Sequence, residues 1–213
     1  MHNSYSDDSY SGTAITDTNQ ETGMGVSLES MAIEMPTVDG HPNRVGFRGV
    51  LTFVDVASDK APAGARGHRV LLTRKAAEQA IPSLLGMGLD YSPRLDCHDT
   101  RRKIGVITRA EIVGREISVA GFLYGRDFPE MVAEIGRGER ADSAGSRGMR
   151  GGTPLPRGQR GMRAGLGMSY EITDALVNDI KAAVWVLNRV TFTGAAVLRR
   201  DKAAYGATWI ELG

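Results

Sequence analysis

The chain has 213 residues, 41% of them hydrophobic and 24% charged, and its 26 basic and 25 acidic residues give a formal net charge of +1. This length suits one domain with appendages, and the near-zero charge excludes a protein that binds polyanions over its whole surface. A single cysteine excludes an intramolecular disulfide and a cysteine-rich zinc site, and no apolar run approaches the length that spans a bilayer.

Residues 1–28 are polar and rich in Ser, Thr, Asp and Asn. Such a segment buries too little apolar surface to offset the entropy of ordering it, so we expect a disordered tail. It has neither the cationic start nor the apolar centre of a signal peptide. The sequence therefore predicts a soluble cytoplasmic protein in which residues 29–213 form a single domain.

The first predicted strand covers residues 44–56, which are β-branched and aromatic with partial alternation, and a bend is expected at Gly49. Pro and Gly then predict a loop over residues 58–68. A helix should follow with Thr73 as its N-cap, and Pro82 should kink or shorten it.

Residues 102–124 alternate apolar and polar side chains on both sides of "VGRE", where Gly114 suits a tight turn, and this pattern predicts a β-hairpin. The next segment, residues 126–138, predicts a short helix with Pro129 in its first turn and Gly136 as its stop.

Residues 136–165 carry seven arginines against two acidic residues and have almost nothing to bury, so we expect a flexible Arg/Gly-rich insertion within the domain. Several roles stay open for it. It could contact nucleic acid phosphates without sequence specificity, contact an acidic scaffold or capsid segment, or be an exposed linker that the protein itself cleaves. It could equally be a solubilising loop with no partner.

Sequence typical of β-strands resumes after the insertion. Strands are predicted over residues 166–172, 182–187 and 189–198, and residues 199–212 should form a short helical turn and a final extended piece.

Two residues could carry chemistry together. His98 stands just before the strand expected to begin at Lys103, so a sheet can hold it, whereas the other histidines lie in the tail or in loops. Ser169 opens a strand but lacks the G-x-S-x-G turn of a nucleophile elbow. Serine hydrolysis needs an imidazole near the hydroxyl, a group that orients it, and donors for the oxyanion. Pattern alone favours a structural or solvent-exposed histidine and an ordinary strand serine.

The order of these segments resembles a known family. The run "RLDCHDTRRKIGVITRAEIVGREISVAGFLYGRDFPEMVAEI", then "LGMSYEI", then "VTFTGAAVLRRDKAAY" is similar to the prohead (capsid maturation) proteases of tailed bacteriophages, which are similar in fold to the herpesvirus assemblins. The likeness covers roughly residues 45–212, interrupted by the insertion. It implies an α+β fold: a mainly antiparallel, closed β-barrel flanked by a few helices.

The resemblance implies that His98 is the general base and Ser169 the nucleophile. Many of the phage proteases that it resembles have an acidic residue in the strand after the serine strand as the third catalytic member. The matching stretch here, "TFTGAAVL", contains no carboxylate. Glu171 lies two residues beyond Ser169 and so on the same strand face, where it could orient His98. Asp174 and Asp179 are looser candidates for the same role, and the alternative is that Glu171 is a solvated strand residue.

The resemblance also points to "LRRDK" for the oxyanion region, which makes Arg199 and Arg200 candidates, with a charged surface turn as the alternative. Cys97 is not expected to act as a nucleophile with His98, because consecutive strand residues point to opposite faces. No metal-ligand spacing is recognisable, and we expect no metal and no cofactor.

The resemblance thus predicts a serine endopeptidase of phage head maturation. It would act in the host cytoplasm inside the assembling procapsid, cleaving scaffold and capsid-protein segments and itself, and a homodimer is plausible. The alternative is a catalytically inactive capsid-associated structural or scaffolding protein of the same fold. A third hypothesis is a nucleic-acid binder that acts through the arginines of the insertion. No membrane partner is expected.

Overall fold

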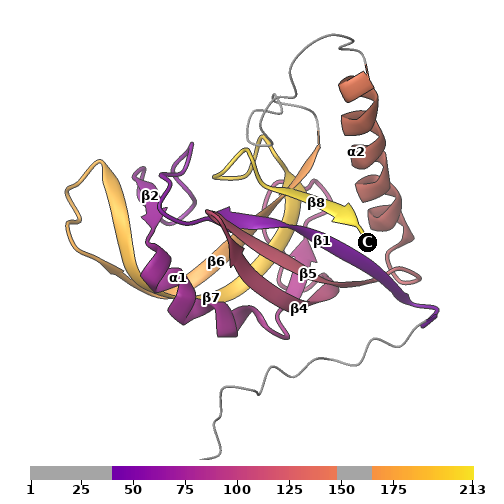
Figure 1. Ribbon diagram of the computed structural model, residues 1–213, viewed down its shortest axis with the longest axis horizontal. Helices are drawn as coiled ribbons and strands as arrows, with labels where there is room; N and C mark the ends of the chain where they lie inside the picture. The colour runs from indigo at the N-terminus through magenta and orange to yellow at the C-terminus, as the bar shows by residue number, and fades with distance from the viewer. Residues whose placement is uncertain (1–39, 148–164) are drawn as a thin grey trace, which may run out of the picture. The chain divides into compact units, whose positions relative to one another are not determined.

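Eight β-strands join in one mixed sheet (Figure 1). The computed structural model describes residues 40–147 and 165–213, with side chains for all of these except 139–147. The strands follow the order β2-β7-β3-β4-β5-β1-β8, and β6 pairs with β7 outside this path. Their bounds are β1 Arg44–Phe53, β2 Arg69–Leu72, β3 Gly88–Tyr91, β4 Lys103–Val113, β5 Glu116–Tyr124, β6 Leu166–Val177, β7 Val184–Arg199 and β8 Trp209–Leu212.

The strongest sequence signals are confirmed. The hairpin of β4 and β5 turns at Gly114, whose φ of +62° suits glycine. Helix α1 (Arg74–Ala80) begins after Thr73, whose hydroxyl accepts the Ala76 N–H at 3.3 Å, and Pro82 falls in a following 3₁₀ turn, η2 (Ile81–Leu84). The Pro82 ring has therefore shortened the helix as expected.

Other boundaries differ from the prediction. Helix α2 (Pro129–Arg147) continues past Gly136 instead of stopping there, so the first part of the predicted flexible insertion is helical. Its remainder, residues 148–164, and the predicted tail over residues 1–28 lie outside the described residues. The two strands predicted over 182–187 and 189–198 are one strand, β7, and the sequence patterns did not predict the short strands β2 and β3.

The predicted closed barrel is wrong, because the sheet is a curled half-barrel. Strands β6 and β8 stand at the two sides of the opening and, within the described chain, share no β-ladder. Backbone groups at these edges form hydrogen bonds with side chains instead. The Thr208 hydroxyl accepts the Met168 N–H at 3.2 Å, and Arg200 Nε donates to the Thr208 carbonyl at 3.1 Å. Helix α2 packs against β8 (Figure 1). The described fold is therefore a mixed α+β structure, mostly strands, with two α-helices.

The core lies on the inner face of this half-barrel. Its fully buried side chains come from nearly every strand and include Leu51, Leu72, Leu89, Ile107 and Ile117. Strand β7 organises the assembly, because it pairs in parallel with β2 near its start and with β3 near its end, and antiparallel with β6 along most of its length. Segments far apart in the sequence, β3 and β6, consequently flank the same stretch of β7.

Candidate active site

A single row of residues crosses four neighbouring strands on the outer face of the sheet. Asp90 of β3 is the register partner of Lys103 in β4 and of Ala196 in β7. Ala196 is in turn the partner of Ser169 in β6. Because paired residues share a face and strands lie about 4.8 Å apart, the backbones of Asp90 and Ser169 stand roughly 10 Å apart across the small side chain of Ala196. The predicted nucleophile therefore shares its face with a carboxylate.

The loop between β3 and β4 carries His98 over this row. The Arg199 N–H, at the end of β7, donates to the Leu95 carbonyl at 2.8 Å, and the Asp99 N–H donates to Asp90 Oδ1 at 3.2 Å. These two bonds fix the loop to β7 on one side of His98 and to β3 on the other. The loop that carries the imidazole is thus held by one backbone–backbone bond and by one bond to the Asp90 side chain.

The His98 ring lies between two carboxylates. Its Nδ1 is 3.5 Å from Asp90 Oδ1 and 3.8 Å from Glu171 Oε1, and the side chain is only 14% exposed. Both ring nitrogens are buried, and neither has a hydrogen-bond partner among the described residues. Buried polar atoms are normally satisfied, and one left unpaired costs about 1–3 kcal/mol. Nδ1 therefore faces two carboxylates, whereas Nε2 faces no polar partner among the described residues.

Glu171 reaches the imidazole because Gly194 leaves space beneath it. The two residues are register partners, and a Cβ added at Gly194 would lie 2.7 Å from Glu171 Oε2. Glu171 and Ser169 are two residues apart on one strand, about 7 Å along its length, and face the same way. The structure thus brings His98, Ser169 and Glu171 to one face. No hydrogen bond joins His98 to Ser169, and the catalytic roles of all three stay predictions.

Asp90 is the member of this cluster that the sequence patterns missed. It is fully buried and its Oδ2 accepts a bond from Lys103 Nζ at 3.0 Å. Burial raises the pKa of Asp90, but the neighbouring His98 and Lys103 outweigh it and hold the pKa below its usual value. The signal available in the sequence was an acidic residue between Leu89 and Tyr91 in a short apolar stretch. A carboxylate buried in such a stretch requires charged or hydrogen-bonding partners, so it indicates a polar cluster nearby.

The two arginines predicted for the oxyanion region lie at the end of β7. Their backbone N–H groups are already bonded, that of Arg199 to the Leu95 carbonyl and that of Arg200 to the Gly165 carbonyl at 3.1 Å. The Arg199 guanidinium lies 3.2 Å from Asp201, and Arg200 Nε bonds to Thr208. The two backbone N–H groups are therefore already used within the fold, and the oxyanion role of these residues stays a prediction.

Other candidate chemistry finds less support in the geometry. Cys97 is exposed, whereas the ring of the adjacent His98 is buried, so the two side chains occupy different environments. In the described ranges, no group of three His, Cys, Asp or Glu side chains is arranged to hold a metal ion. Likewise, none of the described helices is both long and apolar enough to cross a membrane.

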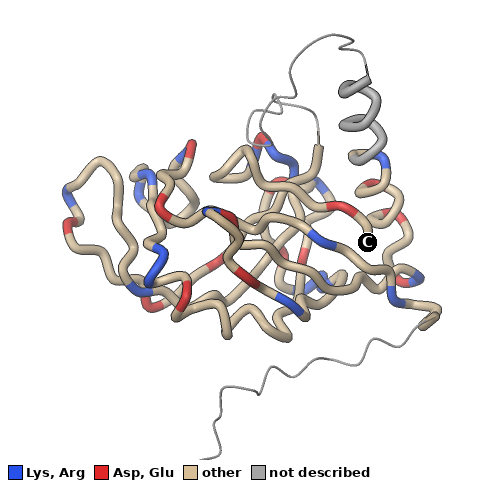
Figure 2. Tube along the Cα trace, in the orientation of Figure 1, with Lys and Arg blue, Asp and Glu red and all other residues tan. Residues whose placement is uncertain are grey.

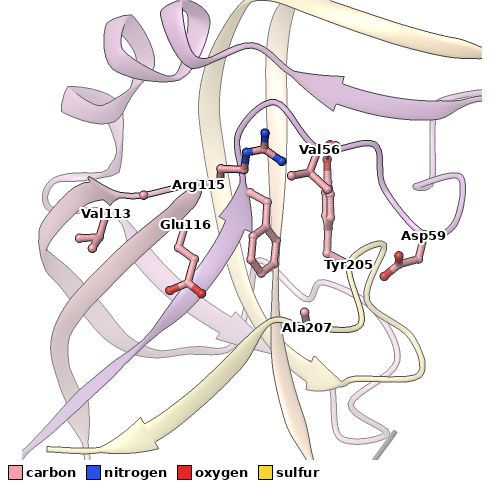
Figure 3. Close-up of a pocket in the computed structure, with 9 residues that line it drawn as sticks. Val56, Asp59, Val113, Arg115, Glu116, Tyr205 and Ala207 are labelled. Atoms are coloured by element: carbon pink, nitrogen blue, oxygen red, sulfur yellow. Dashed lines mark hydrogen bonds between the residues drawn. The ribbon is translucent and has the colours of Figure 1, made fainter. Parts of the chain in front are cut away.

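A separate cleft of about 550 Å³ opens at the far end of β1 (Figure 3). Phe53 and Tyr205 contribute its aromatic surface, with ring centroids 5.8 Å apart, and Asp59, Arg115 and Glu116 supply the charged groups. None of its lining residues is a serine, histidine or cysteine. The cleft therefore has no serine–histidine or cysteine–histidine pair, and it is distinct from the cluster around His98.

Charges of both signs are interspersed over the described strands and loops (Figure 2). Several oppositely charged pairs occur within single strands or between neighbours, such as Arg109 with Glu111 at 3.1 Å and Arg48 with Glu211 at 2.5 Å. The described part of the chain thus carries charges of both signs along the same strands and loops. Neither the protein-family models nor the curated protein sequences contain a match to this chain.

Proposed function

We propose that the protein is a serine endopeptidase in which Ser169 is the nucleophile and His98 the general base. The proposal rests chiefly on one observation: a buried histidine with unpartnered ring nitrogens lies over the same sheet face as the predicted serine. Its carboxylate neighbours both approach Nδ1, which leaves Nε2 as the nitrogen available to a hydroxyl. This division of the two nitrogens is what general base catalysis by an imidazole needs.

The proposed reaction follows from these positions. Ser169 Oγ attacks the scissile carbonyl carbon while His98 Nε2 takes the hydroxyl proton, and the resulting imidazolium then gives that proton to the leaving amine. Water repeats the sequence on the acyl-enzyme and releases the second product. A carboxylate beside Nδ1 stabilises the imidazolium in both halves of the reaction. The missing Ser169–His98 hydrogen bond fits a free enzyme, because such bonds often tighten only when substrate is bound.

The resemblance to prohead proteases supplies the substrate class. We infer that the protein cleaves scaffold and capsid-protein segments, and itself, inside an assembling shell. The same missing hydrogen bond favours the second candidate, a capsid-associated protein of this fold that has no peptidase activity. The two candidates differ in one measurable property, which is whether partner proteins are shortened.

The test is coexpression of the chain with its capsid and scaffold proteins, followed by intact-mass measurement. We expect shortened products with the natural sequence and intact partners with Ser169→Ala. Ser118→Ala is the matched control, because Ser118 is also a half-buried strand serine but lies in β5, away from His98. Products that persist in Ser169→Ala would contradict the proposal, and intact partners with every variant would favour the structural protein.

A further inference from the structure

Two carboxylates compete for the orienting position beside His98, and they differ in how firmly they are held. Asp90 is fully buried, and its two oxygens are used separately. Oδ1 accepts the Asp99 N–H and faces His98, while Oδ2 accepts the Lys103 ammonium. A buried carboxylate persists only when such partners satisfy it, so these contacts fix its place as well as its charge.

Glu171 is held much less firmly. Its side chain is 42% exposed and its oxygen lies farther from Nδ1, at 3.8 Å against 3.5 Å for Asp90. The position of its carboxylate above β7 depends on the absence of a side chain at Gly194. Water screens an exposed carboxylate, so its attraction to an imidazolium is weaker than that of a buried one at similar distance.

We propose that Asp90, a residue of the strand before the histidine, is the positioning residue that orients His98, and that Glu171 is not. The inference rests on the proposed function and deepens it. It assigns the third member of the site to a position that the resemblance does not supply, since the family places its acidic residue after the serine strand. Lys103 takes part indirectly, because it holds the far oxygen of the same carboxylate.

The chemical consequence concerns which ring nitrogen carries the proton. The lowered pKa of Asp90, caused by His98 and Lys103 acting against its burial, leaves only an acceptor facing Nδ1 at neutral pH. Nδ1 must then be the donor, and Nε2 keeps the lone pair that Ser169 requires. An asparagine at this position offers an amide donor, which favours the opposite tautomer without changing the shape of the side chain.

The experiment reads the tautomer of His98 directly, by ¹⁵N NMR of the imidazole at a pH where it is neutral, together with kcat on a cleaved peptide. We expect Asp90→Asn to move the proton from Nδ1 to Nε2 and to lower kcat by about 10³-fold or more. We expect Glu171→Gln to keep the natural tautomer and to lower kcat by less than about 10-fold.

Gly194→Ala is a second way to move the Glu171 carboxylate away from His98, because the new methyl group would lie too close to the carboxylate in its present position. It should behave like Glu171→Gln. Gly46→Ala is the matched control, since a Cβ there meets only ordinary contacts at 3.7 Å or more. If Asp90→Asn fails to fold, Asp90→Asn with Lys103→Met removes both charges of the buried pair, which proteins tolerate better than losing one. The tautomer of that double variant then decides.

A natural tautomer retained in the asparagine variants, or lost in both Glu171→Gln and Gly194→Ala, would overturn the assignment. The NMR signal does not depend on peptidase activity. A tautomer that changes only with Asp90 therefore supports the assignment even when no peptide is cleaved. The absence of cleavage would count against the proposed function alone.

Discussion

The inner and outer faces of β3, β7 and β6 differ in chemistry although they belong to the same strands. On the inner face Leu89, Ala195 and Tyr170 form one register row, and the first two are fully buried in the core. One position along each strand, the outer row holds Asp90, Ala196 and Ser169. Strand side chains alternate between faces, so one backbone can support a packed core and a polar site only a residue apart.

The comparison also shows what each face requires. The inner face is closed by apolar packing, which is non-directional. The outer row is covered by the loop that carries His98, and its polar atoms need specific partners. Changes on the inner face should therefore alter the free energy of unfolding and spare the chemistry, whereas changes on the outer face should affect the chemistry more than the stability. Four predictions, in decreasing order of effect, test this division.

His98→Ala should abolish cleavage, lowering kcat by about 10⁴-fold, because it removes the proposed general base. The free energy of unfolding should change by about 1 kcal/mol or less, since the lost ring contacts are offset by removing two unpaired buried nitrogens. Peptide hydrolysis and urea denaturation measure the two effects. His68→Ala, which removes a ring stacked on Trp185, is the control and should cleave normally. A large loss of stability in His98→Ala would instead indicate a structural histidine.

Leu89→Ala, on the inner face, should lower stability and leave catalysis unchanged. Truncating this fully buried side chain should lower the free energy of unfolding by about 3 kcal/mol and leave the kcat of the folded protein unchanged. Leu176→Ala, at a leucine that is 48% exposed, should change stability by less than about 0.5 kcal/mol. Equal losses in both variants would show that the inner face is not the core.

Tyr170→Phe tests the inner face at alkaline pH. Burial raises the pKa of Tyr170 to about 12 from 10.0, with small opposing effects from Thr52 and Tyr205. Between these values the unfolded chain loses its proton while the folded chain keeps it, so stability should fall as pH rises from 10 to 12, by roughly 3 kcal/mol. The phenylalanine variant should lose less over this range. Parallel curves would contradict the burial of this hydroxyl.

The contribution of Asp90 to the free energy of unfolding at acid pH should be the smallest of the four effects. Its pKa is held below the usual 3.8, so it stabilises the folded state above that value and loses this contribution as pH falls through the lowered pKa. Urea denaturation from pH 7 to 2.5 should therefore show a shallower acid decline for Asp90→Asn with Lys103→Met than for the natural chain. An unchanged slope would mean that the outer pair contributes nothing to stability.

Local signals predicted the elements that depend on local physics. The Thr73 cap, the effect of Pro82 and the Gly114 turn each act within a few residues, and all three are confirmed. Helix α2 passes Gly136 because the cost of a glycine inside a helix, about 1 kcal/mol, is small enough for other interactions to override. Strands β2 and β3 have only four residues each, too few for a periodic pattern to register.

Only some residues of the cluster around His98 could be predicted from the sequence, for a related reason. His98 and Ser169 were found through residue order and a resemblance, and Glu171 through the two-residue spacing along one strand. Asp90 becomes a neighbour of Ser169 only through the parallel pairing of β3 with β7, which joins residues about a hundred positions apart. At the open edges of the half-barrel, the side chains of Thr208 and Arg200 bond to backbone groups, and alternation patterns do not encode such contacts.

The position of β7 between β3 and β6 has a consequence for biosynthesis. The ribosome releases the histidine-bearing and serine-bearing segments well before the end of β7 at Arg199, yet nothing else in the described sheet joins β3 to β6. A nascent polypeptide that has not yet delivered this strand cannot align its own proposed catalytic groups. If the protein has the proposed activity, it would therefore acquire its chemistry only after β7 has joined the sheet.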